Sequence, residues 1–289
     1  MLGQALMVEG RRRGHTMQGA ARSGADYDFD VSSDHTLRAC LTYAKAEIVI
    51  NAAAMTDLAA CELNPGRAVL TNSRPVAVIA KLLAETAPAT RLIQISTDHF
   101  WTTPYRHREA DPVALVNTYA RSKYLGEELA RTHNNSLSVR TNLVGFRGCG
   151  KPTFAEWACD AIETDAPITL FDDFFTSPID VWAFSRILME VIETQPELCG
   201  LLNLAGGEVA GKREIILRLA SAMGKTLTRA KTGSAKRLYP TRALHCGLDV
   251  SRAEQILGRR LPTLDEVIEA LAERRTPWRY LNPSPSTGG

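Results

Sequence analysis

Two short apolar runs, 48–54 and 92–96, restrict the fold of this 289-residue chain more than any other feature. Their sequences, IVINAAA and LIQIS, are typical of strands that are buried on both faces of a sheet. Helices and strands are expected in alternation, with helices over 34–45, 65–85 and 115–131 and a further strand over 137–140. Such alternation predicts right-handed βαβ units. We therefore expect an α/β fold, a doubly wound parallel sheet with helices on both faces.

The alternation loosens after about residue 146, which predicts a second, smaller α/β lobe. Helices are expected near 153–163, 181–194 and 211–223, with extended pieces at 168–171 and 201–204. The domains predicted from this pattern are 1–146, to which segments near 176–206 return, and 147–281. The remaining residues, 282–289, are rich in Pro, Ser and Gly and are predicted to be disordered.

The first residues depart from the usual opening of a dinucleotide-binding fold, which is strand, glycine-rich turn, helix. Here a helix is expected at once, over 2–13, followed by a short strand over 15–22 and a turn over 23–28. Of the usual glycines only Gly3 remains, so Gly3 and Gln4 would be what is left of the phosphate-binding turn. An upstream start, a truncated chain and a degenerate protein all fit this pattern, and the first two are favoured.

A catalytic pair is expected at Tyr119 and Lys123, which form a Y-x-x-x-K motif. On a helix this spacing places both side chains on one face, where an ammonium would lower the pKa of the phenol. The tyrosine could then exchange a proton with a carbonyl or alcohol. Thr97 follows the strand at 92–96, and ligands bind at the carboxyl ends of such strands. An incidental surface pair, with Thr97 as a loop cap, is the alternative.

Composition narrows the class of protein. The formal net charge of +2 is too small to favour a nucleic-acid partner. Six cysteines include no C-x-x-C pair, which leaves a metal site without support and predicts reduced thiols. Neither a secretory leader nor an apolar run of about 18 residues is present, so no membrane partner is expected and the cytoplasm is the expected location.

Three further segments suggest a cofactor. The small side chains Ala52, Ala53 and Ala54 end a predicted strand, where they would let a flat cofactor approach, or would equally serve helix packing. Arg22 could pair with an adenosine 2′-phosphate, or be an exposed loop residue. Asp30, followed by Val31, stands where an acid could accept a hydrogen bond from adenine.

Together these residues resemble the extended short-chain dehydrogenase/reductases and, within them, the dTDP-4-dehydrorhamnose reductases. The resemblance covers nearly the whole chain. The matching pieces are MLGQAL at 1–6, DFDV at 28–31, VINAAA at 49–54 with Thr56 and Glu62, Asn72, ISTD at 95–98, NTYARSK at 117–123 with Gly126 and Glu127, VRT at 139–141, Thr153 with Phe154, FDD at 171–173, SPI at 177–179, LNLAG at 202–206, LDVS at 248–251 and Leu261 with Pro262.

The resemblance implies a Rossmann-type cofactor domain, a C-terminal substrate lobe and reduction of a 4-keto nucleotide sugar by NADPH or NADH, in deoxysugar or polysaccharide biosynthesis. NADPH is weakly favoured by Arg22, and a homodimer is possible. In this family Tyr119 would donate the proton, Lys123 would hold the nicotinamide ribose and Thr97 would orient the carbonyl. Cofactor contacts are implied at Gly3, Gln4, Arg22, Asp30, Val31, Ala52, Ala53, Ala54, Asn72, Tyr119 and Lys123, and substrate contacts at Thr56, Asp98, His99, Asn142 and Leu143.

Two departures from the family pattern bear on the substrate. His99 stands where the family has a tyrosine, and Leu143 stands where it has a tryptophan. Both changes favour a nucleotide sugar other than a rhamnose precursor. Two further functions stay open. An epimerase or dehydratase would need another acid/base pair, for which His99 and Asp98 are the candidates. A non-catalytic binding or regulatory subunit would suit the incomplete phosphate turn.

Overall fold

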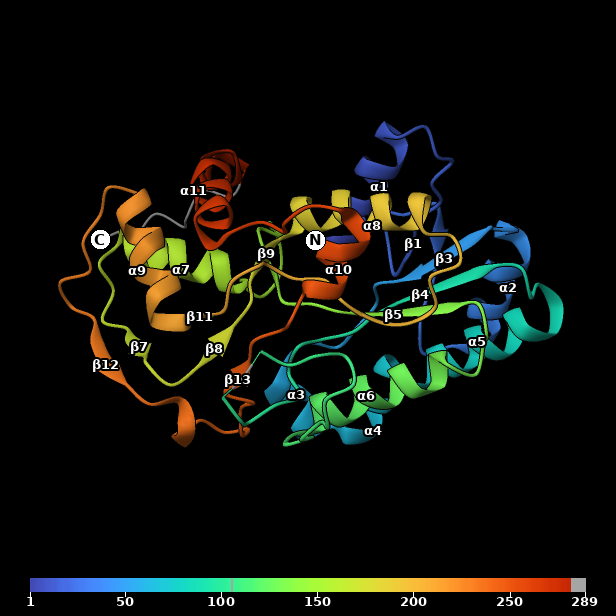
Figure 1. Ribbon diagram of the computed structural model, residues 1–289, viewed down its shortest axis with the longest axis horizontal. Helices are drawn as coiled ribbons and strands as arrows, with labels where there is room; N and C mark the ends of the chain where they lie inside the picture. The colour runs from blue at the N-terminus through green and yellow to red at the C-terminus, as the bar shows by residue number, and fades with distance from the viewer. Residues whose placement is uncertain (105, 282–289) are drawn as a thin grey trace.

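The computed structural model describes residues 1–104 and 106–281, with side chains to residue 275. Its centre is a parallel sheet of four strands in the order β10-β5-β4-β3. The strands are β3 (Ile48–Asn51), β4 (Arg91–Ile95), β5 (Ser136–Arg140) and β10 (Gly200–Asn203). Figure 1 shows helices above and below this sheet. The predicted doubly wound α/β fold is confirmed.

The two faces of the sheet are covered by different helices. On one face, α1 (Leu2–Arg12) packs against α8 (Val181–Thr194), which begins at the capping carboxylate of Asp180. The other face carries α2 (Asp34–Ala44), α5 (Arg74–Thr86) and α6 (Thr118–Ala130), which pack in that order (Figure 1). Every residue of β4 and β5 is buried, because each strand has a neighbour on both sides and helices on both faces.

A second group of elements lies beside the carboxyl end of the sheet, on the left of Figure 1. Its helices are α7 (Phe154–Glu163), α9 (Lys212–Ala222) and α11 (Leu264–Leu281). They enclose a core of their own, with Cys159, Ile162, Leu219 and Leu271 among its buried members. We keep the boundary near residue 146 as a proposal, supported by these separate cores. The predicted tail, 282–289, lies outside the described residues.

Short strands lie within this second group and at its boundary with the first. In the sheet of order β11-β8-β13, β11 runs antiparallel to β8 and β13 runs parallel to it. Two further pairs are parallel, β12 with β7 and β6 with β9. The bounds are β6 (Leu143–Val144), β7 (Thr169–Phe171), β8 (Phe175–Thr176), β9 (Ile179–Asp180), β11 (Ala210–Gly211), β12 (Lys231–Gly233) and β13 (His245–Cys246). The remaining elements are β1 (Ala20–Ala21), β2 (Tyr27–Asp28), α3 (Leu58–Leu63), α4 (Pro65–Asn72), the 3-10 turn Ala235–Arg237 and α10 (Ser251–Leu257).

Three sequence predictions were wrong in detail. The helix expected over 65–85 is two helices, α4 and α5, which meet at Ser73 just before Pro75. A proline ring clashes with the preceding turn, so it is accommodated where a new helix begins. The strand expected over 15–22 is reduced to β1, and the turn expected over 23–28 contains β2, its parallel partner.

The run at 48–54 is also less buried than expected. Residues 48–50 are only half-buried, because β3 is an edge strand of the described four-stranded sheet. A hollow of about 400 Å³ lies beside it, lined by Val49 together with Leu41, Leu82 and other residues of α2 and α5. The apolar pattern identified the strand correctly but not the number of its neighbours.

A buried ion pair fixes α6 against β5. The guanidinium of Arg140 donates to both carboxylate oxygens of Glu127, and both side chains are almost fully shielded from solvent. Phe100 and Trp101 lie over the guanidinium at about 5 Å, and the carbonyl of Glu109 accepts a further hydrogen bond from it. Glu127 lies one helical turn beyond Lys123, so this ion pair fixes the position of α6, the predicted catalytic helix, relative to the end of β5.

We predict that Glu127→Gln lowers the free energy of unfolding by about 3–5 kcal/mol, because it leaves a buried guanidinium without its counter-charge. Urea unfolding followed by circular dichroism measures this change. Glu85→Gln is the matched control, because Glu85 pairs with Lys81 on an exposed helix surface. That control should lose less than about 0.5 kcal/mol. Equal losses in the two variants would contradict a dominant role for the buried pair.

Candidate active site

The predicted catalytic residues converge where β4 ends and α6 begins. The side-chain oxygen of Asn117 caps α6 by accepting the N–H of Ala120 at 2.8 Å, and its amide donates to the carbonyl of Thr241. This cap sets Tyr119 in the first turn, beside the loop that follows β4. The hydroxyls of Tyr119 and Thr97 are hydrogen-bonded to each other. Two residues that are 22 positions apart thus share one site, because Thr97 follows the strand on which α6 packs.

Lys123 lies one helical turn beyond Tyr119 and is buried. Its ammonium donates to the carbonyl of Ile95, the last residue of β4, at 2.7 Å. Burial lowers the pKa of Lys123 to about 8, and the nearby Glu127 carboxylate limits that decrease. The ammonium is therefore poised to lose its proton in the range where enzymes commonly work.

The electrostatic prediction for Tyr119 was wrong for this structure. Burial raises the pKa of Tyr119 above its ordinary value, and the hydrogen bond from Thr97 offsets only part of that rise. Lys123 does not lower it, because its ammonium is engaged with the backbone of Ile95. Tyr119 is thus a neutral phenol, which is the form that donates a proton.

Asn72 has a positioning role in this structure, and the cofactor contact that the resemblance implies stays a prediction. Its buried side-chain amide accepts the N–H of Met55 at 2.7 Å and donates to the carbonyl of Met55 and to the hydroxyl of Ser122. It therefore fastens the loop after β3 to α6. Gly126 allows the same close approach, because a Cβ there would lie 2.7 Å from the carbonyl oxygen of Asn72.

Asp98 joins the two lobes rather than facing open solvent. One of its carboxylate oxygens accepts hydrogen bonds from the amide of Asn142 and the hydroxyl of Thr176, each at 2.8 Å. Burial raises the pKa of Asp98 to about 6, although Thr176, Lys212 and Asn142 each favour the ionised form. The substrate contacts predicted for Asp98 and Asn142 stay predictions. The structure adds the hydrogen bond that the Asn142 amide donates to the Asp98 carboxylate.

His99 is buried between the two lobes and is electrically neutral. Its ring lies 6.1 Å from the ring centres of both Tyr119 and Phe174. Its Nδ1 is 3.9 Å from the Sγ of Cys246. Burial, together with the positive charges of Arg242 and Lys212, lowers the pKa of His99 to about 3. A neutral imidazole can donate or accept a hydrogen bond here but contributes no positive charge.

The predicted cofactor residues occupy a more open surface. Gly3, Gln4, Arg22, Asp30 and Thr56 are exposed, whereas Val31, Leu143 and Ala52 to Ala54 are half-buried. No side chain caps the start of α1, so its first N–H groups can bind an anion. The hydroxyl and the N–H of Ser32 both donate hydrogen bonds to the carboxylate of Asp30. These bonds, together with the nearby charge of Arg22, lower the pKa of the Asp30 carboxyl. The ligand contacts of all these residues stay predictions.

Sequence reasoning missed the residues that the C-terminal lobe contributes to this site. Lys212, Cys246, Phe174 and Arg242 all lie close to His99 or to its neighbours. For Lys212 a signal was available, since a lysine in the first turn of a helix opposes the helix dipole. The others carry no recognisable motif. Their approach to His99 depends on how the two lobes are packed.

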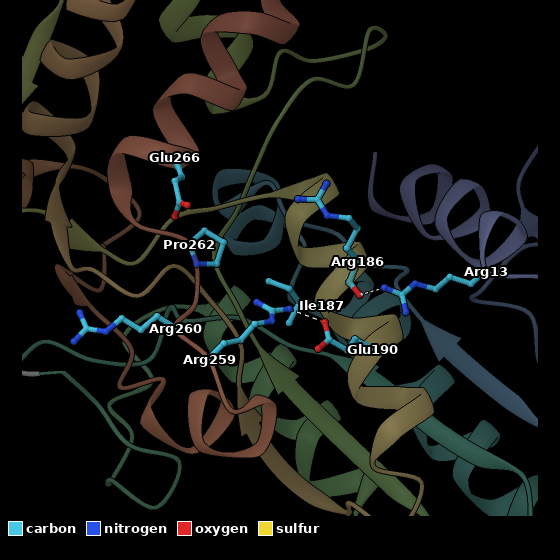
Figure 2. A pocket seen from close by; sticks show the side chains of 8 residues that line it. All are labelled: Arg13, Arg186, Ile187, Glu190, Arg259, Arg260, Pro262 and Glu266. Carbon is cyan, nitrogen blue, oxygen red and sulfur yellow. Dashed lines mark hydrogen bonds and ion pairs between the residues drawn. The ribbon is translucent and has the colours of Figure 1, made fainter.

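A charged hollow of about 300 Å³ lies elsewhere, between α8 and the loop that precedes α11. Figure 2 shows Arg13 reaching the backbone of Arg186, and Arg259 reaching Glu190. Arg13 also pairs with Glu193 at 2.6 Å. Because Arg13 and Arg259 are already paired with carboxylates, and no predicted catalytic residue lines the hollow, the site between the lobes is the stronger candidate.

Comparison with known proteins gives a consistent result. The family model described as RmlD substrate binding domain matches residues 1–276. The chain is 25% identical to a probable low-salt glycan biosynthesis reductase, Agl14, of Haloferax volcanii, over 94% of each protein. It is 26% identical to the dTDP-4-dehydrorhamnose reductase of Mycolicibacterium smegmatis, over 94% of this chain and 81% of that protein. Its fold matches the dTDP-4-dehydrorhamnose reductase of Bacillus anthracis in complex with NADP, with a TM-score of 0.78, 20% identity and 93% of each chain covered.

We predict that the stability of the protein depends on the protonation of Asp98. Because the pKa of Asp98 rises from 3.8 to about 6 on folding, its stabilising contribution is complete below about pH 4 and is lost as the pH rises through about 6. As the pH rises from about 4 to above 6, the unfolding free energy of the wild type should fall by up to about 3 kcal/mol more than that of Asp98→Asn. Urea unfolding at several pH values measures it. Asp28→Asn, at an exposed position, is the control, and parallel pH profiles for wild type and Asp98→Asn would refute the prediction.

Proposed function

This chain belongs to the RmlD substrate binding domain family, and from that premise we propose that it is an NAD(P)H-dependent reductase of a 4-keto nucleotide sugar. Its relatives include reductases of this kind and a reductase of glycan biosynthesis. A role in deoxysugar or polysaccharide biosynthesis follows from the same premise.

The observation that carries the proposal is the arrangement of Thr97, Tyr119 and Lys123. The Thr97 and Tyr119 hydroxyls are hydrogen-bonded, so both can bind one carbonyl oxygen from the same side. Lys123 lies below Tyr119 on the same helix, and its ammonium points to the end of β4. All three residues lie at the carboxyl end of the parallel sheet, which is where ligands bind in such folds.

The chemistry requires one hydride and one proton. A bound dihydronicotinamide would supply the hydride to the carbonyl carbon. As that C–H bond forms, the C=O π electrons move to oxygen, and Tyr119 donates its phenolic proton there to give the alcohol. Thr97 orients the carbonyl and shares the developing negative charge. The Lys123 ammonium, with a pKa of about 8, can return a proton to Tyr119 once substrate and cofactor have loosened its bond to Ile95.

The residues present fit a dinucleotide. The half-buried alanines 52–54 let a flat ring approach the backbone, and the uncapped first turn of α1 offers N–H groups to a phosphate. Gly3 is exposed, and a Cβ there would meet no atom within 4 Å, so a ligand can approach closely. Arg22 directly follows β1 and is exposed, which supports NADPH as the cofactor.

Two observations favour a reductase over an epimerase or dehydratase. His99 is held neutral, and the strongly bonded oxygen of Asp98 is shared between Asn142 and Thr176. Neither side chain is therefore a free acid or base beside Tyr119. A non-catalytic subunit would not need the hydrogen-bonded hydroxyls of Thr97 and Tyr119 beside the buried Lys123, because burying such polar groups is costly.

We predict that Tyr119→Phe lowers the rate of keto-sugar reduction by about 100-fold or more, because no other group donates the proton. The oxidation of NADPH, followed by its absorbance with dTDP-4-dehydro-6-deoxy-L-mannose or a related keto sugar, measures this rate. Tyr239→Phe is the matched control, since Tyr239 is 81% exposed and should leave the rate unchanged.

The thermal midpoint of each variant shows whether the fold is retained. Turnover by folded Tyr119→Phe at the wild-type rate would exclude Tyr119 as the proton donor. Failure of the wild-type chain to oxidise NADPH with any keto nucleotide sugar would count against the reductase itself.

A further inference from the structure

Lys212 is a cation in a position that costs stability. It is the first residue of α9, directly after the N-cap Gly211, where the helix dipole opposes positive charge. Its side chain is half-buried, and burial lowers its pKa. The helix dipole and burial both disfavour the charge of Lys212 at this position, which suggests that a ligand compensates for it.

The surroundings of Lys212 hold the ammonium without pairing it. Its Nζ lies 4.0 Å from the ring centre of Phe154 and 5.6 Å from that of Phe174. The faces of these rings attract a cation but leave its N–H donors without an oxygen acceptor. Within residues 1–104 and 106–275, no carboxylate forms an ion pair with Lys212.

Asp98 offsets part of the decrease in the pKa of Lys212, yet both of its oxygens are hydrogen-bonded to other side chains. One of its oxygens accepts from both Asn142 and Thr176, and the other faces the hydroxyl of Thr97 at 3.4 Å. Asp98 therefore balances the charge of Lys212 through space but does not bind its protons. The other cation near His99 is Arg242, and the carboxylate that favours its charged form, Asp57, is itself ion-paired with Lys151 at 2.7 Å.

The position of Lys212 identifies the part of the substrate that it would bind. Its Nζ lies 5.6 Å from the ring centre of Phe174, and that ring lies 6.1 Å from the ring of His99. The ring of His99 in turn lies 6.1 Å from the ring of Tyr119. Because Tyr119 must deliver its proton to the sugar, the group within reach of Lys212 belongs to the sugar ring rather than to the diphosphate.

We propose that Lys212 binds a carboxylate on the sugar ring, so that this chain acts on a nucleotide-activated sugar acid. The inference rests on the proposed function above, whose site it refines. The anion supplies the acceptor that the ammonium lacks, and Phe154 and Phe174 shield the resulting pair from water. Shielding strengthens the attraction, because fewer water molecules screen the two charges.

The test compares ligands that differ only in this carboxylate. We would measure by calorimetry the affinities of UDP-glucuronic acid against UDP-glucose, and of dTDP-glucuronic acid against dTDP-glucose. The wild type should prefer the acid by at least about tenfold, as expected for a hydrogen bond between charged groups. Lys212→Met should abolish the preference and leave the affinity for the neutral sugar within about twofold. Lys212→Arg should retain part of the preference.

Lys231→Met is the matched control, because Lys231 is an exposed lysine of β12 in the same lobe. Circular dichroism shows whether each variant is folded. If Lys212→Met weakens the binding of the sugar acid, the neutral sugar and free UDP by the same factor, Lys212 binds the diphosphate and the inference is wrong. Wild-type binding of UDP-glucose or dTDP-glucose without a preference for the acid overturns the inference alone. Failure to bind any nucleotide sugar overturns the proposed function as well.

Discussion

The buried pair of Arg140 and Glu127 is the interaction on which the rest of the site depends. It joins the end of a central strand to the helix that carries Tyr119 and Lys123. Two charges in this environment are stable only together, since either one alone would be an unpaired ion in an apolar core. The guanidinium also lies under Phe100 and Trp101, in the loop that follows Thr97. One ion pair thus fixes both the helix and the loop between which a carbonyl would bind.

The site is built as a chain of polar contacts across the two lobes. Asn72 fastens the loop after β3 to α6, and Asn117 fastens α6 to the segment at Thr241. Asp98 then joins the loop after β4 to Thr176 of β8 in the second lobe. The bonds of Asn72 and Asp98 are buried and that of Asn117 is partly buried, so removing a partner costs more than at an exposed bond. The contacts of Asp98 and Asn117 thus hold the catalytic edge of the first lobe against the second.

Electrostatics divide the site into two parts. Beneath Tyr119, Lys123 is held by a backbone carbonyl and Glu127 lies within one turn, so charge there is balanced inside the protein. Near His99, Lys212 and Arg242 create a positive environment, and a carboxylate favours the charged form of each only through space. Burial keeps His99 neutral, so the positive charge available to a ligand comes from Lys212 and Arg242. The same site can therefore combine proton donation by a neutral phenol with recognition of an anion.

The sequence by itself determined the strands at 92–96 and 137–140, the helix at 181–194 and the closeness of Tyr119 to Lys123. These follow from local rules, namely apolar runs, helical spacing and short connections. Tertiary structure alone decided the half-exposed β3, the break between α4 and α5, the positioning role of Asn72 and the pKa of Tyr119. It also placed Lys212, Phe174 and Cys246 near His99. Burial and pairing depend on which distant segments become neighbours, and no spacing within the sequence records that.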